Sequence, residues 1–202
     1  MAPICSEKTA TMAKELNICR VRDGEKSVNL NQRMCSHAPR QIYIKITHFQ
    51  IMKNITRASP EDAITILELQ KLAYQSEAQL YHDFSIPPLL QTVDELRNDF
   101  VDKVFLKIQS EGKIVGSVRG YQTGDTCYIE RLIVHPDYQG KGIGTVLMQQ
   151  IELCFCQARR FELFTGHNSK RNIHLYERLG YKIFKSEEIN KTLSFIFMEK
   201  HK

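Results

Sequence analysis

Long apolar runs are missing from this sequence. No stretch of about 18 consecutive apolar residues, the length that a membrane-spanning helix needs, occurs in the 202 residues. The first residues also lack the apolar core of a secretory signal, and they carry Glu7 and Glu15 instead. We therefore expect a cytoplasmic protein that has no membrane partner.

Cysteine pairs with metal-ligand spacing are missing as well. None of the six cysteines forms a C-x-x-C pair, and Cys154 and Cys156 are two residues apart on an expected helix. Side chains at that spacing point in different directions, which suits neither a zinc site nor a disulfide. His135, His167 and His174 show no metal-ligand spacing either. We expect reduced thiols and no metal.

A strongly basic domain is a third absence. The net charge is +5, but residues 1–51 contribute +4 and residues 52–202 only +1. The larger part of the chain is therefore nearly neutral, which argues against a nucleic-acid-binding face. A nucleic-acid role for the basic first segment is an alternative, although aromatic residues are not interleaved there and no known binding module is present. We expect no nucleic-acid partner.

The composition changes near Met52. Residues 1–40 are polar with few periodic apolar positions, so we expect residues 1–51 to form a disordered or weakly ordered extension. Within this extension, residues 42–49 alternate apolar and polar side chains as an extra strand would. From Met52 the pattern is regular, and we expect residues 52–202 to form one domain.

The regular part predicts an α/β fold. A helix should begin at Ser59-Pro60 and run to about Gln75, and Thr92 with Glu95 forms a capping box for a second helix. One helix should follow the glycines near 142, and another should end at Gly180. The expected strands are 53–58, 104–109, 113–121, 126–134, 161–165, 181–185 and 192–200. This order predicts a mixed, mostly antiparallel sheet with one parallel crossover after the glycines.

Apolar periodicity predicts which helix faces are buried. The first helix and the helix after the glycines should each bury one stripe of side chains. The last helix should bury Leu175 and Leu179. The two stripes are Ile66, Leu69, Leu72 and Ala73, and Ile143, Val146, Leu147, Gln150 or Ile151, and Cys154.

A glycine-rich stretch, HPDYQGKGIGT at 135–145, stands between the third meander strand and a helix. Such a stretch is typical of a phosphate site, because a helix N-terminus offers unpaired N–H groups and a positive dipole end. Lys141 is followed by Gly142, so the nucleotide-triphosphate loop G-x-x-x-x-G-K-[ST] is excluded. The dinucleotide pattern G-x-G-x-x-G also fails. A purely structural role, in which glycines let the helix pack against a strand, is the remaining alternative.

The pattern Gln139-x-x-Gly142-x-Gly144 resembles motif A of the GNAT family of N-acetyltransferases. Downstream, Asn172 to Tyr181 (NIHLYERLGY) resembles the motif B of the same family. The order of elements from Met52 is also that of the family, so the resemblance covers residues 52–202. It implies the GNAT acyl-CoA N-acyltransferase fold and acetyl-CoA as co-substrate.

The resemblance also implies roles for individual residues. Backbone groups of Leu132, Ile133 and Val134 would meet the pantetheine arm of coenzyme A, and Asn172 would reach the same arm. Tyr176 would be the general acid for the leaving thiolate, a transfer that is uphill by about 1.5 pKa units for a free tyrosine and thiol, or about 2 kcal/mol. The pyrophosphate would lie on Gln139, Gly140, Lys141, Gly142, Ile143, Gly144 and Thr145.

The acceptor implied by the family is an amine, whose proton a base must take. Glu130 is our candidate, although a strand glutamate can equally be a partner of Arg119 or Arg131. Glu77 and Asp83 are further candidate bases. The acceptor wall would include Tyr81, His82, Phe84 and residues 85–90.

The resulting hypothesis is direct acetyl transfer from acetyl-CoA to an amine of a small molecule, peptide or protein. The alternative is a catalytically silent acyl-CoA sensor or interaction module. We expect a monomer or homodimer. Because Met52 begins a chain of the usual family length, translation starting there is a further hypothesis.

Overall fold

The computed structural model describes residues 54–202. The predicted extension over residues 1–51 and the strand over 42–49 lie outside the described residues. Within the described part, no helix is long and apolar enough to cross a membrane.

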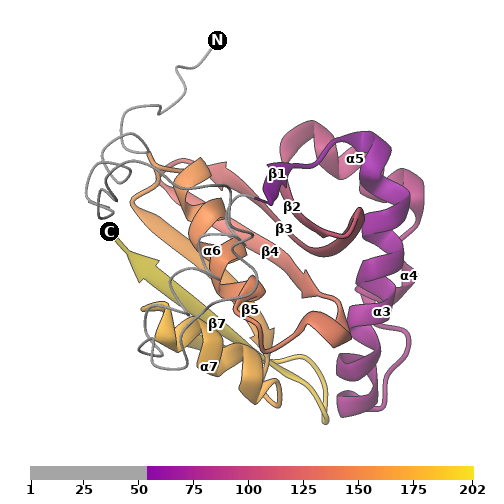
Figure 1. The fold of residues 1–202 in the computed structure, drawn as a ribbon. Coiled ribbons are helices and arrows are strands. Elements are labelled where there is room, and N and C mark those ends of the chain that lie inside the picture. Colours follow the sequence, from indigo (N-terminus) through magenta and orange to yellow (C-terminus); the bar gives the residue numbers. More distant parts are fainter. Residues whose placement is uncertain (1–53) are drawn as a thin grey trace, which may run out of the picture. The chain divides into compact units, whose positions relative to one another are not determined.

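The described residues form one sheet of seven strands in the order β1-β2-β3-β4-β5-β7-β6 (Figure 1). Neighbouring strands are antiparallel except for β4 and β5, which are parallel. The mixed, mostly antiparallel sheet with one parallel crossover is therefore confirmed. The bounds are β1 Ile55–Arg57, β2 Val104–Ser110, β3 Lys113–Thr123, β4 Thr126–Val134, β5 Arg160–Gly166, β6 Lys182–Glu188 and β7 Ser194–His201.

The helices follow the predicted order with one addition. Pro87 and Pro88 lie in a short helix outside the expected elements, because proline is compatible with a first helical turn. The first helix also continues to Tyr81, beyond its expected end. The bounds are α3 Ala63–Tyr81, α4 Pro87–Leu90, α5 Val93–Asp102, α6 Ile143–Cys154 and α7 Lys170–Arg178, with short 3-10 turns at Pro60–Asp62 and Pro136–Tyr138.

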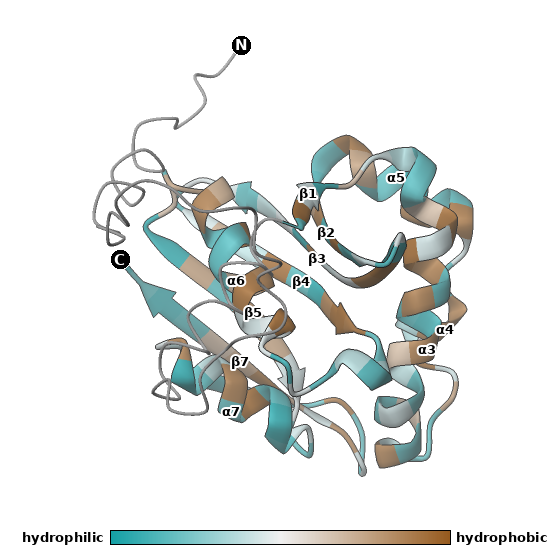
Figure 2. Cartoon of the chain, in the orientation of Figure 1, coloured by the Kyte–Doolittle hydropathy of each residue, from teal (hydrophilic) through white to brown (hydrophobic). Residues whose placement is uncertain are grey.

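The sheet carries a hydrophobic cluster on each face because strand side chains alternate. Phe105 packs in the cluster with α3 and α5, and the next residue, Leu106, packs in the cluster with α6 and α7. In the same way, Ile114 packs in the cluster with α3 and α5, and Val115 packs in the cluster with α6 and α7. The alternation of apolar and polar residues along strands and helices can be followed in Figure 2. Helices therefore cover both faces of the sheet.

Most of the predicted helix faces are buried, Ala73, Leu175 and Leu179 are partly buried, and two predicted side chains are exposed. Leu72 is 43% exposed, because six residues from Ile66 turn the helix by about 240° and point the side chain away from the sheet. Cys154 is exposed because it is the last residue of α6. The capping box of α5 is confirmed: the backbone N–H of Thr92 donates to Glu95, and Thr92 Oγ1 accepts from the Glu95 N–H.

Strand β4 contains a bulge that changes the alternation. Between the pairs Ser117–Ile133 and Arg119–Glu130, two residues of β4 oppose a single residue of β3. Arg131 occupies the bulge with a φ of 50°, a left-handed conformation that costs a side chain-bearing residue roughly 1–2 kcal/mol. Ile129 therefore packs with α6, whereas Ile133, four residues later, packs with α3 on the opposite face.

The bulge lies where β4 and β5 separate. The two strands pair only from Thr126 to Tyr128 on β4 and from Arg160 to Glu162 on β5. Beyond these residues each strand continues without the other as partner. The sheet is thus open between the second half of β4 and the end of β5.

Candidate active-site cleft between β4 and β5

A cleft of about 810 Å³ occupies the opening between the two strands. The second half of β4 and the end of β5 form its sides. The glycine loop and the start of α6 border it, as do α7, the second half of α3 and the turn into α4. Segments far apart in the sequence therefore meet around a single space.

The three glycines of the loop are required for two different structural reasons. Gly140 and Gly142 adopt left-handed φ angles of 74° and 85°, and a Cβ at either would meet nothing within 4 Å. Gly144 is different, because its Cβ would lie 3.3 Å from Leu175 Cδ2 and 3.7 Å from Leu132 Cδ2. The first two glycines thus give the loop its conformation and leave open space beside it, and the third lets α6 pack closely.

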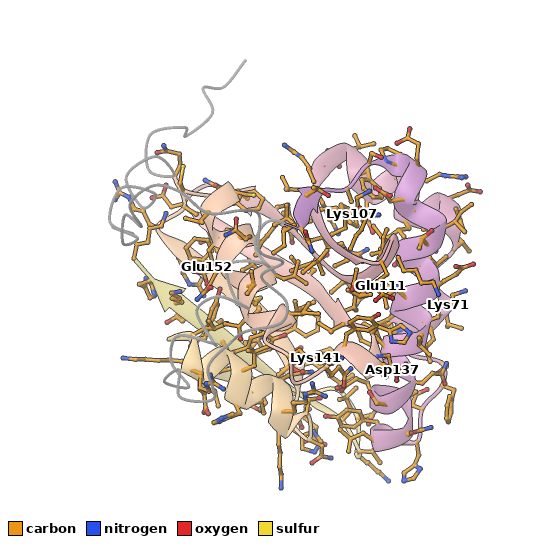
Figure 3. The ribbon with its side chains drawn as sticks, viewed as in Figure 1. Lys71, Lys107, Glu111, Asp137, Lys141 and Glu152 are labelled. Atoms are coloured by element: carbon orange, nitrogen blue, oxygen red, sulfur yellow. The ribbon has the colours of Figure 1, made fainter. Side chains whose placement is uncertain are left out.

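Side-chain contacts fasten the loop to its surroundings. Gln139 Nε2 donates to the carbonyl oxygen of Val134 at 3.0 Å, and Gln139 Oε1 accepts from Arg171 of α7. Lys141 lies in the loop before α6 (Figure 3), and its Nζ is 4.7 Å from the ring centroid of Tyr138. Gln139 and the rest of the predicted pyrophosphate loop border the cleft, but Lys141 does not.

The predicted pantetheine contacts also border the cleft. Leu132, Ile133 and Val134 line it from β4, and Asn172 lines it from α7. The Asn172 side chain is already bonded, since its Nδ2 donates to Glu77 Oε1 at 3.3 Å.

Tyr176 lies on α7 and borders the same cleft, with 7% of its surface exposed. Burial raises the pKa of its phenol above the ordinary range, and the charges of Tyr74 and Glu77 raise it further. The phenol therefore keeps its proton at neutral pH. Proton transfer to a thiolate is correspondingly more uphill than for a free tyrosine.

Glu130 borders the cleft but is held by two cations. Its carboxylate accepts from Lys103 Nζ at 2.8 Å and lies 3.6 Å from Arg119 Nε. Asp99 completes the group, at 3.0 Å from Lys103 and 3.2 Å from Arg119. Desolvation raises the pKa of Asp99, but the charge of Arg119 and the hydrogen bonds from Lys103 and Gln91 together outweigh it and lower that pKa overall. The two cations and two carboxylates balance in charge.

Glu77 has neutral partners instead. Its carboxylate accepts from Ser169 Oγ at 2.5 Å, in addition to Asn172. Nearby, the Tyr81 hydroxyl accepts from the backbone N–H of Asn168 at 2.7 Å. A Cβ at Gly166 would clash with the Tyr81 ring, whose Cζ would be only 2.7 Å away. These contacts join the end of α3 to the start of α7.

Part of the expected acceptor wall borders the cleft. Tyr81 and residues 85–88 border the cleft, whereas His82, Phe84 and residues 89–90 do not. Asp83, a candidate base, also borders it. The Arg131 bulge was not foreseen, and no glycine marks it in the sequence. Gly166, whose missing side chain admits Tyr81, was also missed; an isolated glycine at a strand end was its only signal.

Comparison with known proteins gives the family. A sequence model of the acetyltransferase (GNAT) family matches residues 65–181. The chain belongs to this family. It is 28% identical over 156 residues to an uncharacterized N-acetyltransferase of Methanocaldococcus jannaschii, a match that covers 73% of this chain and 66% of the relative.

Solved structures show the same GNAT fold. The PaiA N-acetyltransferase of Thermoplasma acidophilum, solved with coenzyme A, is 19% identical with a TM-score of 0.60, over 73% of this chain and 98% of that protein. YncA of Salmonella typhimurium, solved with acetyl-CoA, is 19% identical with a TM-score of 0.57, over 73% and 92%. The chain spans 33% to 66% of the length of four curated relatives that it matches.

Among residues 54–202, no group of three or more His, Cys, Asp or Glu side chains could hold a metal ion.

Proposed function

We propose that residues 52–202 form an N-acetyltransferase domain that moves the acetyl group of acetyl-CoA directly to an amine. The observation that carries the proposal is the single cleft that borders both the glycine loop and Tyr176. A cofactor that enters along β4 would have its pyrophosphate at one end of this cleft and its thioester near the other. Family membership supports the same reaction class.

The loop fits a pyrophosphate. Gly140 and Gly142 leave space within 4 Å of where side chains would be, so phosphate oxygens can approach the backbone. The first turn of α6 adds N–H groups that have no intrahelical partner, and the helix dipole favours an anion there. Each hydrogen bond to a charged oxygen is worth about 1.5–3 kcal/mol. Lys141 would act from outside the cleft wall, as a nearby charge.

In the proposed reaction the neutral amine nitrogen attacks the thioester carbonyl carbon. A C–N bond forms, the C–S bond breaks, and the thiolate of coenzyme A leaves. The amine proton goes to a base and the thiolate gains a proton. Tyr176 is our proposed acid: it remains protonated until negative charge builds on sulfur, and its hydrogen bond stabilises that charge.

Two carboxylates are proposed as the base. Glu130 is the candidate from the family resemblance, but its Oε2 already lies 2.8 Å from Lys103 Nζ and 3.6 Å from Arg119 Nε. Glu77 accepts only from the neutral Ser169 and Asn172 in the hydrogen bonds described above. We therefore propose Glu77 as the better base and Glu130 as the alternative.

Isothermal titration with acetyl-CoA, followed by mass spectrometry of a panel of amines, tests the proposal. Binding together with acetylation of at least one amine is expected. Absence of binding at millimolar acetyl-CoA would refute the cofactor assignment. Binding without any acetylated amine would favour the alternative, a silent acyl-CoA sensor. A cytoplasmic location, a monomeric or homodimeric state and the absence of a nucleic-acid partner remain predictions from the sequence.

A further inference from the structure

The cleft has a second half that the cofactor assignment leaves unexplained. It lies between the turn from α3 into α4, the end of β5 and the turn that joins β6 to β7. Seven of its side chains are apolar: Ile86, Pro87, Pro88, Phe164, Ile189, Leu193 and Phe195.

Several of these apolar groups remain open to solvent. Ile189 and Phe164 are each 45% exposed, and the Phe164 ring stacks at a tilt on Phe195 with 4.8 Å between centroids. Asn190 holds the β6–β7 turn, because its Oδ1 accepts from the backbone N–H groups of Thr192 and Leu193. The apolar wall is therefore built on an ordered turn, and covering it would release water from apolar surface.

Charged side chains divide between the two halves of the cleft. Arg171 and Arg178 border it from α7, where Arg171 donates to Gln139 of the glycine loop, and Glu77 and Asp83 border it from α3 and the turn that follows. An anionic cofactor suits the first pair, and a cationic acceptor suits the second.

The two carboxylates of the second half are Glu77 and Asp83, and the hydrogen bonds described for them come from neutral groups. Asp83 accepts from the backbone N–H and the hydroxyl of Ser85 at 2.8 and 2.5 Å. These bonds lower the pKa of Asp83, so it is charged at neutral pH. Glu130 is already balanced by its cations, and the Arg131 guanidinium lies over the ring of Tyr74 at 5.7 Å.

We infer that the acceptor is an amine with an apolar body and no anionic group beside the nitrogen. This inference rests on the proposed transferase function and names its substrate class. Glu77 and Asp83 attract the ammonium form, and the apolar wall receives the carbon skeleton. A carboxylate next to the amine would lie beside Glu77 and Asp83 and be repelled by their charges.

Two substrate comparisons test the class directly. Phenethylamine and L-phenylalanine share a body and differ by the carboxylate, and glucosamine presents an amine on a polar body. We expect kcat/KM for phenethylamine to exceed that for each of the others by about tenfold or more. Equal or faster acetylation of phenylalanine or glucosamine would overturn the inference and leave the transferase function intact.

Two variants with matched controls test the named walls. Ile189→Gln should lower kcat/KM for phenethylamine by about three- to tenfold. Ile183→Gln should not, because Ile183 is similarly exposed (52%) but lies outside the cleft wall. Asp83→Asn, which keeps an oxygen to accept from Ser85, should lower it by about two- to fivefold, and Asp94→Asn on α5 should have no effect.

The two proposals fail in different ways. If acetyl-CoA binds and no amine of any class is acetylated, the transferase function fails and this inference fails with it. If phenethylamine is acetylated but Ile189→Gln and Asp83→Asn behave like their controls, the transferase function stands and the assigned acceptor half is wrong.

Discussion

Replacing Gly142 in the glycine loop by alanine should weaken cofactor binding by more than its effect on stability explains. Gly142 has a φ of 85°, and a Cβ there meets nothing within 4 Å. Gly112, in the turn between β2 and β3, has a φ of 75° and equally open surroundings, but it does not border the cleft. Alanine in this left-handed conformation costs roughly 1–2 kcal/mol at either site. Gly112→Ala is therefore a matched control for Gly142→Ala.

The two variants should differ in their affinity for coenzyme A. A methyl group at Gly142 enters the space that the proposed pyrophosphate needs. Loss of one charge-assisted hydrogen bond, about 1.5–3 kcal/mol, weakens binding about 10- to 150-fold. Gly112→Ala should keep the wild-type dissociation constant.

Urea denaturation and calorimetry provide the two measurements. The chain has no tryptophan, so far-ultraviolet circular dichroism is the suitable probe of unfolding, and isothermal titration gives the dissociation constant. A Gly142→Ala protein that loses stability but binds coenzyme A within about twofold of wild type would refute the pyrophosphate assignment. Equal weakening in Gly112→Ala would assign the loss to folding instead.

Three other predictions follow from the site. Tyr176→Phe should bind acetyl-CoA as the wild type does and turn over about 10²- to 10⁴-fold more slowly; unchanged turnover in steady-state assays would remove it as the acid. Glu77→Gln should lower kcat more than Glu130→Gln, and the reverse order in the same assay would make Glu130 the base. The free energy of unfolding should decrease as the pH falls from about 4. The pKa of Asp99 is lower in the folded state than in the unfolded state, partly through the charge of Arg119, so its stabilisation is complete above the unfolded-state pKa and is lost as the pH falls through the folded-state pKa. Asp99→Asn should show a shallower fall in urea titrations from pH 7 to pH 3.

The element order and the glycine loop could be predicted because their signals are local. Capping residues, short turns and alternation lie within a few positions of each other, and they gave the mixed sheet and its parallel crossover. The prolines of α4 carried an ambiguous local signal, since proline can either stop a helix or begin one.

Contacts between distant segments could not be predicted in this way. Glu77 bonds to Ser169 across 92 positions of the chain, and nothing near either residue indicates the other. The same holds for the pairs of Lys103 with Glu130 and of Asp99 with Arg119, which exist only because α5 lies beside β3 and β4. Glu130 was foreseen as a cleft residue, but its two cationic partners depend on the tertiary arrangement.

The bulge at Arg131 gives β4 one residue more than regular pairing with β3 needs. Ile129 and Ile133 are both buried, on opposite faces of the sheet. Removing one residue between them would abolish the bulge and leave both isoleucines on their present faces, because residues three positions apart on a regular strand point to opposite sides. Conservative substitutions in this segment would also leave both cores in place. A one-residue deletion at the bulge should therefore spare both cores and remove the left-handed kink at Arg131, near the point where β4 and β5 separate.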